Sequence, residues 1–296
     1  MNKPFFSIVI PTYNRAELLR RCLDSVIKQT YTSWEAIVVD NFSEDNTEDV
    51  VASFGDPRIR FVKNHNHGVI SVSRNKAIDM AQGQWICFLD SDDAWFPTKL
   101  EVIFKYTEKY DLIYHEYMMN IKRTRPFQRI KSNFYTIGDM SMKEVMRRGD
   151  PICPSCAAVS RIALGDTRFS EDKALFAVED YDFFLQLIDK GLCIKHLKQA
   201  LTHYDVSTGV SHGRIALDRD RRLYIKYLDK LSREDIREIL KYYYLRKAGY
   251  FYQPGSYHVA MRYFAIAASA KDKHTRNKGL SRWLKAFILN IISKLK

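Results

Sequence analysis

Three carboxylates lie within four residues at Asp90, Asp92 and Asp93, directly after the apolar run 85–89. Clustered carboxylates repel one another, and burying them is costly unless a positive charge compensates. A divalent cation is the simplest compensator. Hard oxygen ligands suit Mg²⁺ or Mn²⁺, and these ions in turn bind phosphate oxygens. The segment therefore predicts either a metal-assisted phosphate site or a polar loop whose aspartates cap the next helix.

Alternating strands and helices would place this segment at the edge of a sheet. Runs of β-branched and aromatic residues predict four strands, at 5–10, 34–39, 58–62 and 85–89. Helical spacing predicts three helices between them, at 15–29, about 43–54, and 69–81. Such alternation implies a parallel α/β sheet covered on both faces, whose ligands bind beyond the carboxyl ends of the strands. We therefore expect 12–14, 40–41 and 90–93 to converge in space.

The remainder of the chain has a mixed and then a helical pattern. Short strands are predicted at 112–114 and 156–159, and a helix follows at about 178–190. Beyond residue 215 the pattern is mostly helical, with a hairpin of 242–251 and 257–270. The domains expected are an α/β domain over 1–215 and a helical C-terminal region over 216–296. The α/β domain divides into a nucleotide-binding half, about 1–110, and an acceptor half, about 111–215.

Composition excludes several classes of protein. The 296 residues are 46% hydrophobic and 13% aromatic, which argues against disorder. No apolar run approaches the ~20 residues needed to span a bilayer, and the N-terminus shows no secretory signal. Five cysteines, an odd number, do not suggest a disulfide framework and fit a reducing cytosol. Cys153 and Cys156 have the spacing of a metal knuckle or redox pair, but no second pair accompanies them for a structural zinc.

The positive charge is concentrated in the C-terminal part. The net charge is +12, and residues 241–296 hold 12 Lys+Arg against the single acid Asp272. The tail 279–296 is also amphipathic, with one apolar stripe of Leu280, Trp283, Leu284, Phe287, Ile288, Ile291, Ile292 and Leu295. A basic helix with such a stripe is typical of membrane-surface helices. We therefore expect an anionic membrane as partner and no nucleic acid. The alternative is docking of the stripe onto the body or onto a second subunit.

Taken together, five segments resemble the family-2 glycosyltransferases, which have the GT-A fold. The matching segments are 6–15, 38–47, 68–75, 88–93 and 179–182. Their order and spacing fit over about residues 5–210. The resemblance implies an inverting enzyme that moves a sugar from a nucleotide diphosphate, commonly a UDP-sugar, to a hydroxyl of a glycan acceptor. A lipid-linked acceptor at the cytoplasmic membrane face, in surface polysaccharide or glycoconjugate synthesis, would suit the predicted tail.

The resemblance also implies where the donor binds. Pro11, Thr12 and Tyr13 would line the base and ribose, and Asp40 would accept a hydrogen bond from the base. Arg74 would approach the nucleotide phosphates, a task that suits a guanidinium. The alternative interpretation of Arg74 is a solvated arginine on the surface of a helix.

The remaining implied roles are chemical. Asp92 would coordinate Mn²⁺ or Mg²⁺, Asp90 would meet the ribose or a metal-bound water, and Asp93 would orient Asp92. The metal would act as a Lewis acid on the leaving diphosphate. Asp180 matches the catalytic base, which takes the proton of the acceptor hydroxyl. Its alternative is a carboxylate stabilised by the N-terminus of a helix, and Glu179 is the neighbour most easily confused with it.

One segment departs from the family pattern. Where the family often has Tyr-Arg-x-His, this chain has Asp205 in place of the arginine and Ser207 in place of the histidine. The third metal ligand therefore stays open. The departure also motivates a different hypothesis, a catalytically silent nucleotide-sugar-binding or scaffolding protein. A dinucleotide oxidoreductase is disfavoured because no Gly-x-Gly-x-x-Gly follows the first strand.

Overall fold

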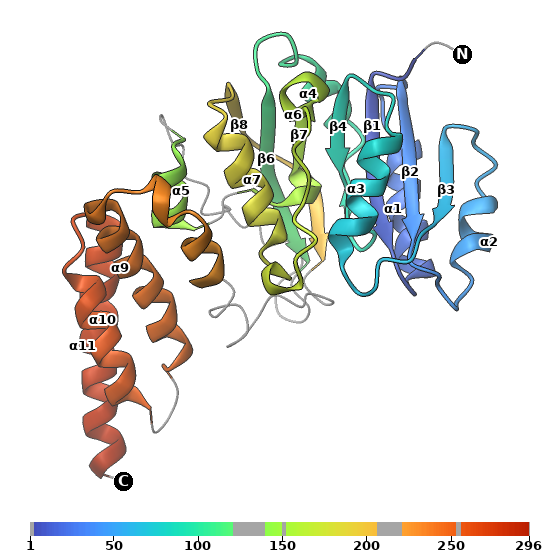
Figure 1. Cartoon of the computed structure of the whole chain (residues 1–296). Coiled ribbons are helices and arrows are strands. Elements are labelled where there is room, and N and C mark those ends of the chain that lie inside the picture. Colours follow the sequence, from blue (N-terminus) through green and yellow to red (C-terminus); the bar gives the residue numbers. More distant parts are fainter. Residues whose placement is uncertain (1–2, 121–139, 150–151, 206–220, 253–255, 296) are drawn as a thin grey trace. The chain divides into compact units, whose positions relative to one another are not determined.

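A computed structural model of the chain describes residues 3–120, 140–149, 152–205, 221–252 and 256–295 (Figure 1). The chain divides into two compact units. The first unit contains residues 1–140 and 151–210, and the second contains 141–150 and 211–296. Among the helices that the structure describes, none combines the length and apolar character needed to cross a membrane.

The described part of the first unit is built on one eight-stranded sheet with the order β3-β2-β1-β4-β7-β6-β8-β5. The strands are β1 Phe6–Thr12, β2 Trp34–Asp40, β3 Ile59–Lys63, β4 Trp85–Phe88, β5 Ala94–Trp95, β6 Leu112–Asn120, β7 Ala157–Ser160 and β8 Ile194–Asp205. Strands β1 to β4 are parallel to one another, as are β6 and β8, whereas β7 and β5 run antiparallel to their neighbours. The expected mostly parallel α/β sheet is confirmed.

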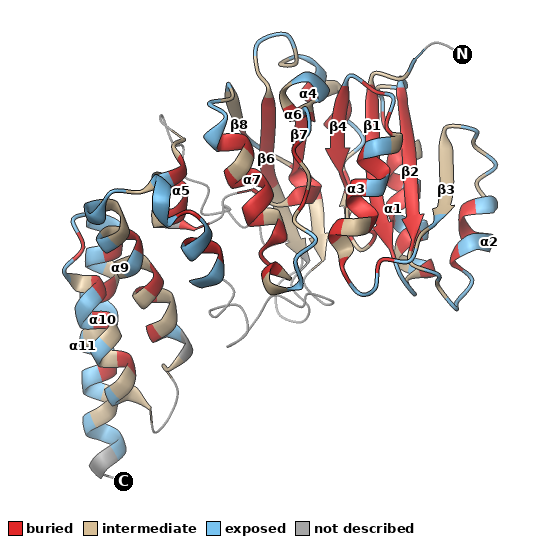
Figure 2. Cartoon of the chain, viewed as in Figure 1, coloured by how far each residue is buried: buried red, intermediate tan, exposed pale blue. Residues whose placement is uncertain are grey.

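Helices cover both faces of this sheet, and Figure 2 shows the central strands as buried. The helices of the first unit are α1 Ala16–Ile27, α2 Thr47–Ala52, α3 Ile70–Met80, α4 Lys99–Phe104, α6 Arg161–Leu164 and α7 Glu179–Asp189. Side chains alternate along β1, so Ile8 packs in one core with residues of α1 and α4. Val9 packs in the opposite core with residues of α3 and α7. Both faces are therefore apolar, which explains the continuous hydrophobic runs.

Strand β1 continues two residues past the expected end, through Pro11 to Thr12. A proline inside a sheet removes a hydrogen-bond donor and is tolerated only where no neighbour needs it. Strand β4 pairs with β1 as far as Phe88, opposite Val9. Pro11 lies two residues further along β1, and its backbone nitrogen points toward the same neighbouring strand as that of Val9. Strand β4 has already ended there, so no β4 residue pairs with Pro11. The strand therefore carries Thr12 and Tyr13 to the edge of the sheet without losing a ladder bond.

The second half of the sheet differs most from the sequence expectation. Strand β8 was not predicted, because its run of Lys195, His196, Lys198 and Gln199 has neither strict alternation nor a continuous apolar stretch. It forms through parallel pairing with β6, with irregular register near Glu116. Strand β6 itself is much longer than the predicted 112–114.

The second unit is helical in its described part. It contains α5 Met142–Arg148, α9 Arg233–Tyr250, α10 Tyr257–Ala268 and α11 Lys273–Leu295. Ser232 and Asp235 form a reciprocal capping box at the start of α9. Buried Leu245, Phe264 and Ala286 bring α9, α10 and α11 into one core. The predicted hairpin of two helices is present, but α9 begins nine residues before Tyr242.

Candidate active site

The carboxyl ends of β1, β2 and β4 surround a pocket of about 280 Å³, which we call the strand-end pocket. Its lining includes Pro11, Thr12 and Tyr13, the residues expected to line a base and ribose. The same pocket is lined by Ser91 from the acidic loop, defined here as Asp90–Asp93. The other lining residues are Arg15, Asn41, Asn66, Gly68, Ile70 and Phe176. The convergence of loops from three strands is therefore as the sequence predicts.

Asp40 ends β2 beside this pocket but is not itself part of its lining. It pairs with Thr12 across the sheet and is almost fully buried. Its carboxylate accepts hydrogen bonds from Ser43, from the backbone N at 3.0 Å and from the side-chain hydroxyl. Asn41 Oδ1 accepts from Asn66 N at 2.8 Å, which joins the loops after β2 and β3. The hydrogen bond from Asp40 to a base stays a prediction.

Unusual backbone conformations gather around the strand-end pocket. Among the described residues, positive φ angles occur at four non-glycine positions, Asn14 (48°), Phe42 (56°), His67 (51°) and Ala177 (65°). Each adjoins a residue of the pocket lining. Left-handed backbone at such residues costs free energy, and it persists mainly where the surrounding structure imposes it at ligand sites. Asn and His adopt this conformation comparatively often, so the backbone strain falls chiefly on Phe42 and Ala177.

Arg74 connects the acidic loop to the expected catalytic helix. It lies on α3, is only 4% exposed, and donates from Nη2 to Asp90 Oδ1 at 2.7 Å. Its Nη1 reaches Glu179 Oε1 at 3.2 Å. Burial alone would lower the pKa of Arg74, but the carboxylates of Asp90 and Glu179 outweigh it and raise the pKa. A solvated helix arginine is therefore wrong for this position.

Asp180 lies in the first turn of α7, next to the Glu179 carboxylate that binds Arg74. Burial raises the pKa of Asp180 to about 7, and the negative charge of Glu179 adds to that rise. Its Oδ1 accepts a hydrogen bond from Tyr181 N at 2.8 Å. A carboxyl group that titrates near neutral pH in this setting has the property of a general base. Glu179 and Asp180 can also be assigned different roles, because Glu179 is ion-paired with Arg74.

The acidic loop is supported by Ser155, which lies in the one-turn 3₁₀ helix Pro154–Cys156. Ser155 Oγ accepts from Asp90 N at 3.0 Å. The carbonyl oxygen of Ser155 accepts from three buried donors, which are Trp95 Nε1 at 3.0 Å, Lys99 Nζ at 2.7 Å and Thr202 Oγ1 at 3.0 Å. The serine between Cys153 and Cys156 therefore positions the loop.

Lys99 is a buried cation beneath the same loop. Its side chain is fully buried, and Nζ lies 3.6 Å from the centroid of the Trp95 ring. Burial lowers the pKa of Lys99 to about 8. A cation–π contact and a short hydrogen bond offset part of the cost of burying this charge. Nothing in the sequence pattern marked Lys99 or Ser155, because their partners lie on other strands.

Two further arginines, one just before α1 and one within it, also contact the acidic loop. Arg15 Nη1 lies 2.5 Å from Asp92 Oδ2. Arg21 contacts the Asp92 carbonyl oxygen and Asp205 Oδ2, the latter at 3.2 Å. Asp205 N in turn donates to Asp93 Oδ1 at 2.9 Å. The aspartate that departs from the family pattern is thus bound to the acidic loop, whereas Ser207 and the segment 206–211 lie outside the described residues.

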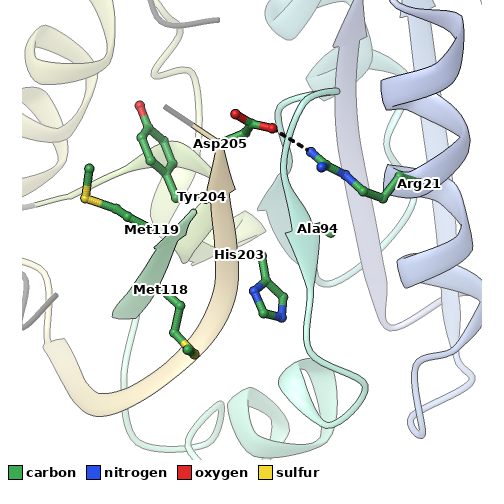
Figure 3. Close-up of a pocket in the computed structure, with 7 residues that line it drawn as sticks. All are labelled: Arg21, Ala94, Met118, Met119, His203, Tyr204 and Asp205. Atoms are coloured by element: carbon green, nitrogen blue, oxygen red, sulfur yellow. Dashed lines mark hydrogen bonds and ion pairs between the residues drawn. The ribbon is translucent and has the colours of Figure 1, made fainter. Parts of the chain in front are cut away.

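A second pocket of about 370 Å³ adjoins the acidic loop and is shown in Figure 3. Its lining comes from β5, β6 and β8 together with Arg21 of α1. Met118, Met119 and Tyr204 give it an apolar wall, and the ion pair of Arg21 with Asp205 lies at one side. No sequence motif predicted this pocket, because it depends on the unpredicted strand β8.

The acidic loop presents carboxylate oxygens of the kind that a hard cation prefers. Within the described residues, no group of three or more His, Cys, Asp or Glu side chains is disposed to hold a metal ion. An Mg²⁺-type ion, however, needs only one or two protein carboxylates when substrate phosphates complete its shell. The buried Asp93 Oδ2 has no hydrogen-bond partner in the described structure. The carboxylate donors therefore fit a cation that is shared with a phosphate ligand.

Comparisons with known proteins agree with this arrangement. The sequence model of the family described as "Glycosyl transferase family 2" matches residues 7–167. The Escherichia coli UDP-Glc:alpha-D-GlcNAc-diphosphoundecaprenol beta-1,3-glucosyltransferase WfaP is 30% identical over 206 residues, which cover 69% of this chain and 78% of WfaP.

Two solved structures show the same fold. S. aureus TarS 1–349 in complex with UDP-GlcNAc matches with a TM-score of 0.65 at 19% identity, over 95% of this chain and 90% of that one. The mannosyltransferase PcManGT from Pyrobaculum calidifontis, in complex with GDP-Man and Mn²⁺, matches with a TM-score of 0.60 at 19% identity, over 98% and 88%. The implied GT-A fold is confirmed. Since the family match covers more than half of the sequence, the chain belongs to glycosyl transferase family 2.

Proposed function

We propose that this chain is an inverting, metal-dependent glycosyltransferase that moves a sugar from a UDP-sugar donor to a hydroxyl of a lipid-linked glycan. The observation that carries the proposal is the bridge made by Arg74. It connects Asp90 of the acidic loop to Glu179, the neighbour of Asp180. The expected donor site and the expected base therefore belong to one cluster beside the strand-end pocket.

The donor would place its base and ribose against Pro11, Thr12 and Tyr13, with Asp40 behind them. The complex of TarS with UDP-GlcNAc supports uridine as the base. The complex of PcManGT with GDP-Man makes guanosine the alternative to be tested. Arg74 is fixed by two carboxylates, so we assign it to positioning the acidic loop beside the phosphates.

Asp92 would hold the cation, with Asp90 at the ribose or at a metal-bound water. When bound, the cation would stabilise the negative charge of the leaving diphosphate. The Mn²⁺ in the PcManGT complex supports this assignment. Asp93 is almost fully buried and accepts a hydrogen bond from the backbone N of Asp205. Its contribution is therefore to fix the shape of the loop. Ser155 also fixes the shape of the loop, because its hydroxyl oxygen accepts a hydrogen bond from Asp90 N.

Asp180 would act as the general base. The acceptor oxygen attacks the anomeric carbon as the bond from that carbon to the donor phosphate breaks, and Asp180 takes the hydroxyl proton. One such displacement inverts the anomeric configuration. A carboxyl pKa of about 7 suits this role near neutral pH. Glu179 does not compete, since it is held by Arg74.

The acceptor is proposed to be lipid-linked, at the cytoplasmic face of a membrane. The name of WfaP specifies a diphosphoundecaprenol acceptor, and helix α11 supplies a matching surface. Leu280 and Leu284 are each 54% exposed, and Phe287, Ile288, Ile291 and Ile292 are exposed as well. Basic residues accompany this apolar stripe, so the helix suits an anionic lipid surface.

The docking of α11 onto its own bundle uses a different face. Ala286 is fully buried, and a Cβ on Gly279 would come within 2.6 Å of Ala268 N. Trp283, which the sequence places in the apolar stripe, is partly buried against this core. The side chain of Leu295 lies outside the described residues. Membrane contact through the remaining stripe therefore requires no undocking of the helix.

A donor screen tests the proposal directly. The melting temperature of the full chain is measured with UDP-, GDP- and dTDP-sugars, with and without Mn²⁺, because a ligand that binds the folded state raises it. We expect a UDP-sugar with Mn²⁺ to give the largest rise. Stabilisation by a donor without any turnover, with a range of lipid-linked acceptors, would instead support the catalytically silent binding protein.

A further inference from the structure

Arg15 lies between the strand-end pocket and the acidic loop. It follows the strand-end segment 11–14 and precedes α1. Arg15 lines the strand-end pocket, and its guanidinium contacts Asp92, with Nη1 2.5 Å from Oδ2. Asp92 is the carboxylate assigned above to the cation. A guanidinium therefore engages the carboxylate that is assigned to the cation.

The position of Arg15 differs from that of the other two arginines. Arg74 is 4% exposed and held by two carboxylates, so it is fixed. Arg21 contacts the backbone carbonyl of Asp92 and the side chain of Asp205. The Arg15 side chain is 32% exposed, and Asp92 is its one hydrogen-bond acceptor in the described structure. It can therefore leave Asp92 by losing a single partner.

The geometry of the pocket indicates where Arg15 would go. A nucleoside diphosphate whose base lies at Pro11–Tyr13, with its phosphates directed toward Asp92, must place those phosphates along the wall that Arg15 lines. A guanidinium binds phosphate oxygens with two parallel hydrogen bonds. A guanidinium and a divalent cation on the same carboxylate oxygen would repel each other.

We propose that Arg15 is an exchangeable counter-charge. It contributes to neutralising Asp92 while the site is free of donor, and it moves to the diphosphate when the donor and its cation bind, so that its contact with Asp92 is exchanged for one with phosphate. This inference rests on the proposed function and adds to it a binding residue for the diphosphate. An exchange of this kind predicts two effects of opposite sign when Arg15 is substituted. Without Arg15 the cation alone binds more tightly, and the nucleoside diphosphate binds more weakly.

The test uses the full-length chain with Arg15→Gln, Arg15→Lys and the control Arg20→Gln. Arg20 is an exposed arginine on the same helix that contacts Ser53 and not the acidic loop. Mn²⁺ affinity without nucleotide is measured by electron paramagnetic resonance of the free ion. Affinities for UDP, GDP and uridine at saturating Mn²⁺ are measured by calorimetry. Circular dichroism and the melting temperature establish that each variant is folded.

For Arg15→Gln we expect Mn²⁺ alone to bind about 3-fold more tightly, as relief of a half-exposed charge contact predicts. We expect UDP to bind about 10-fold or more weakly, as for the loss of a charged hydrogen bond. Uridine, which has no phosphate, should bind unchanged. Arg15→Lys should recover part of the UDP affinity, and Arg20→Gln should behave as the wild type.

The outcomes separate this inference from the proposed function. Opposite shifts for Mn²⁺ and UDP support the exchange. Wild-type protein that binds UDP, together with an Arg15→Gln variant whose Mn²⁺ and UDP affinities both fall or both stay unchanged, overturns the exchange alone. Wild-type protein that binds neither UDP nor GDP overturns the proposed function, and the exchange with it.

Discussion

The site depends, at the scale of single residues, on one buried guanidinium. Arg74 neutralises Asp90 and Glu179 at distances of 2.7 and 3.2 Å. Removing one partner of a buried ion pair leaves uncompensated charge. We therefore expect Arg74→Gln to reduce the free energy of unfolding by about 3 kcal/mol and to abolish donor binding, as measured by urea denaturation and calorimetry. Unchanged stability would contradict the bridging role, and Arg168→Gln on the exposed pair with Asp79 is the matched control.

Asp180 gives a second prediction, through the pH dependence of stability. Its pKa of about 7 in the folded chain exceeds the ordinary value of 3.8. The folded state therefore binds this proton more tightly than the unfolded state, and stability falls as pH rises from about 4 through 7. In the folded chain Asp180 is charged mainly above about pH 7, and Asp180→Asn removes that charge. We expect the variant to melt about 3 °C above the wild type at pH 8 and by a smaller margin at pH 5, where the wild type has lost only part of the stability that ionisation removes. An equal difference at both pH values would contradict the shifted pKa.

The sequence predicted the acids of the site but not what holds them. Aspartates that follow apolar strands are visible in one dimension, so Asp40, Asp90 and Asp92 could be placed at the sheet edge. The hydrogen bonds of Ser155 and Lys99 join β4, β5 and β8. Such contacts depend on pairings between distant strands and leave no local pattern.

A turn positions the acidic loop at the scale of secondary structure. The 3₁₀ turn Pro154–Cys156 presents Ser155 Oγ to Asp90 N. With Ser155→Ala, that backbone N–H would remain buried without its acceptor, at a cost of about 1–3 kcal/mol. We expect lower stability in urea and weaker Mn²⁺ binding, whereas Ser170→Ala, whose hydroxyl accepts a long hydrogen bond of 3.4 Å from Asp172 N, should change neither. Wild-type Mn²⁺ affinity in a folded Ser155→Ala protein would contradict this assignment.

Element prediction succeeded where the pattern was local. The first three strand–helix pairs have apolar runs of strand length followed by helical spacing, and all of them are present. Strand β8 is rich in lysine and lies parallel to β6, so its existence depends on a distant partner. The length of α11 was underestimated because its first turns, 273–278, are polar and are stabilised by packing of Thr275.

The distribution of charge and apolar surface gives a prediction at the scale of the whole molecule. Leu284 and Ile288 are exposed on α11, in the part of the chain that carries the basic surplus. We expect Leu284→Asn with Ile288→Asn to abolish sedimentation with phosphatidylglycerol liposomes and to leave UDP binding unchanged. Ile162→Asn, at a 94% exposed position in the first unit, is the control. Liposome binding that survives the double substitution would contradict the membrane role of the stripe.

In the proposed function, Asp180 removes the proton of the acceptor hydroxyl while the donor is held at the strand-end pocket. The most direct measurement is release of UDP from the stabilising UDP-sugar, with a lipid-linked acceptor, by wild type, Asp180→Asn and Ser170→Ala. We expect Asp180→Asn to lose turnover by a factor of about 100 or more with an unchanged Kd for UDP, and Ser170→Ala to match the wild type. Turnover by Asp180→Asn at the wild-type rate would contradict the account.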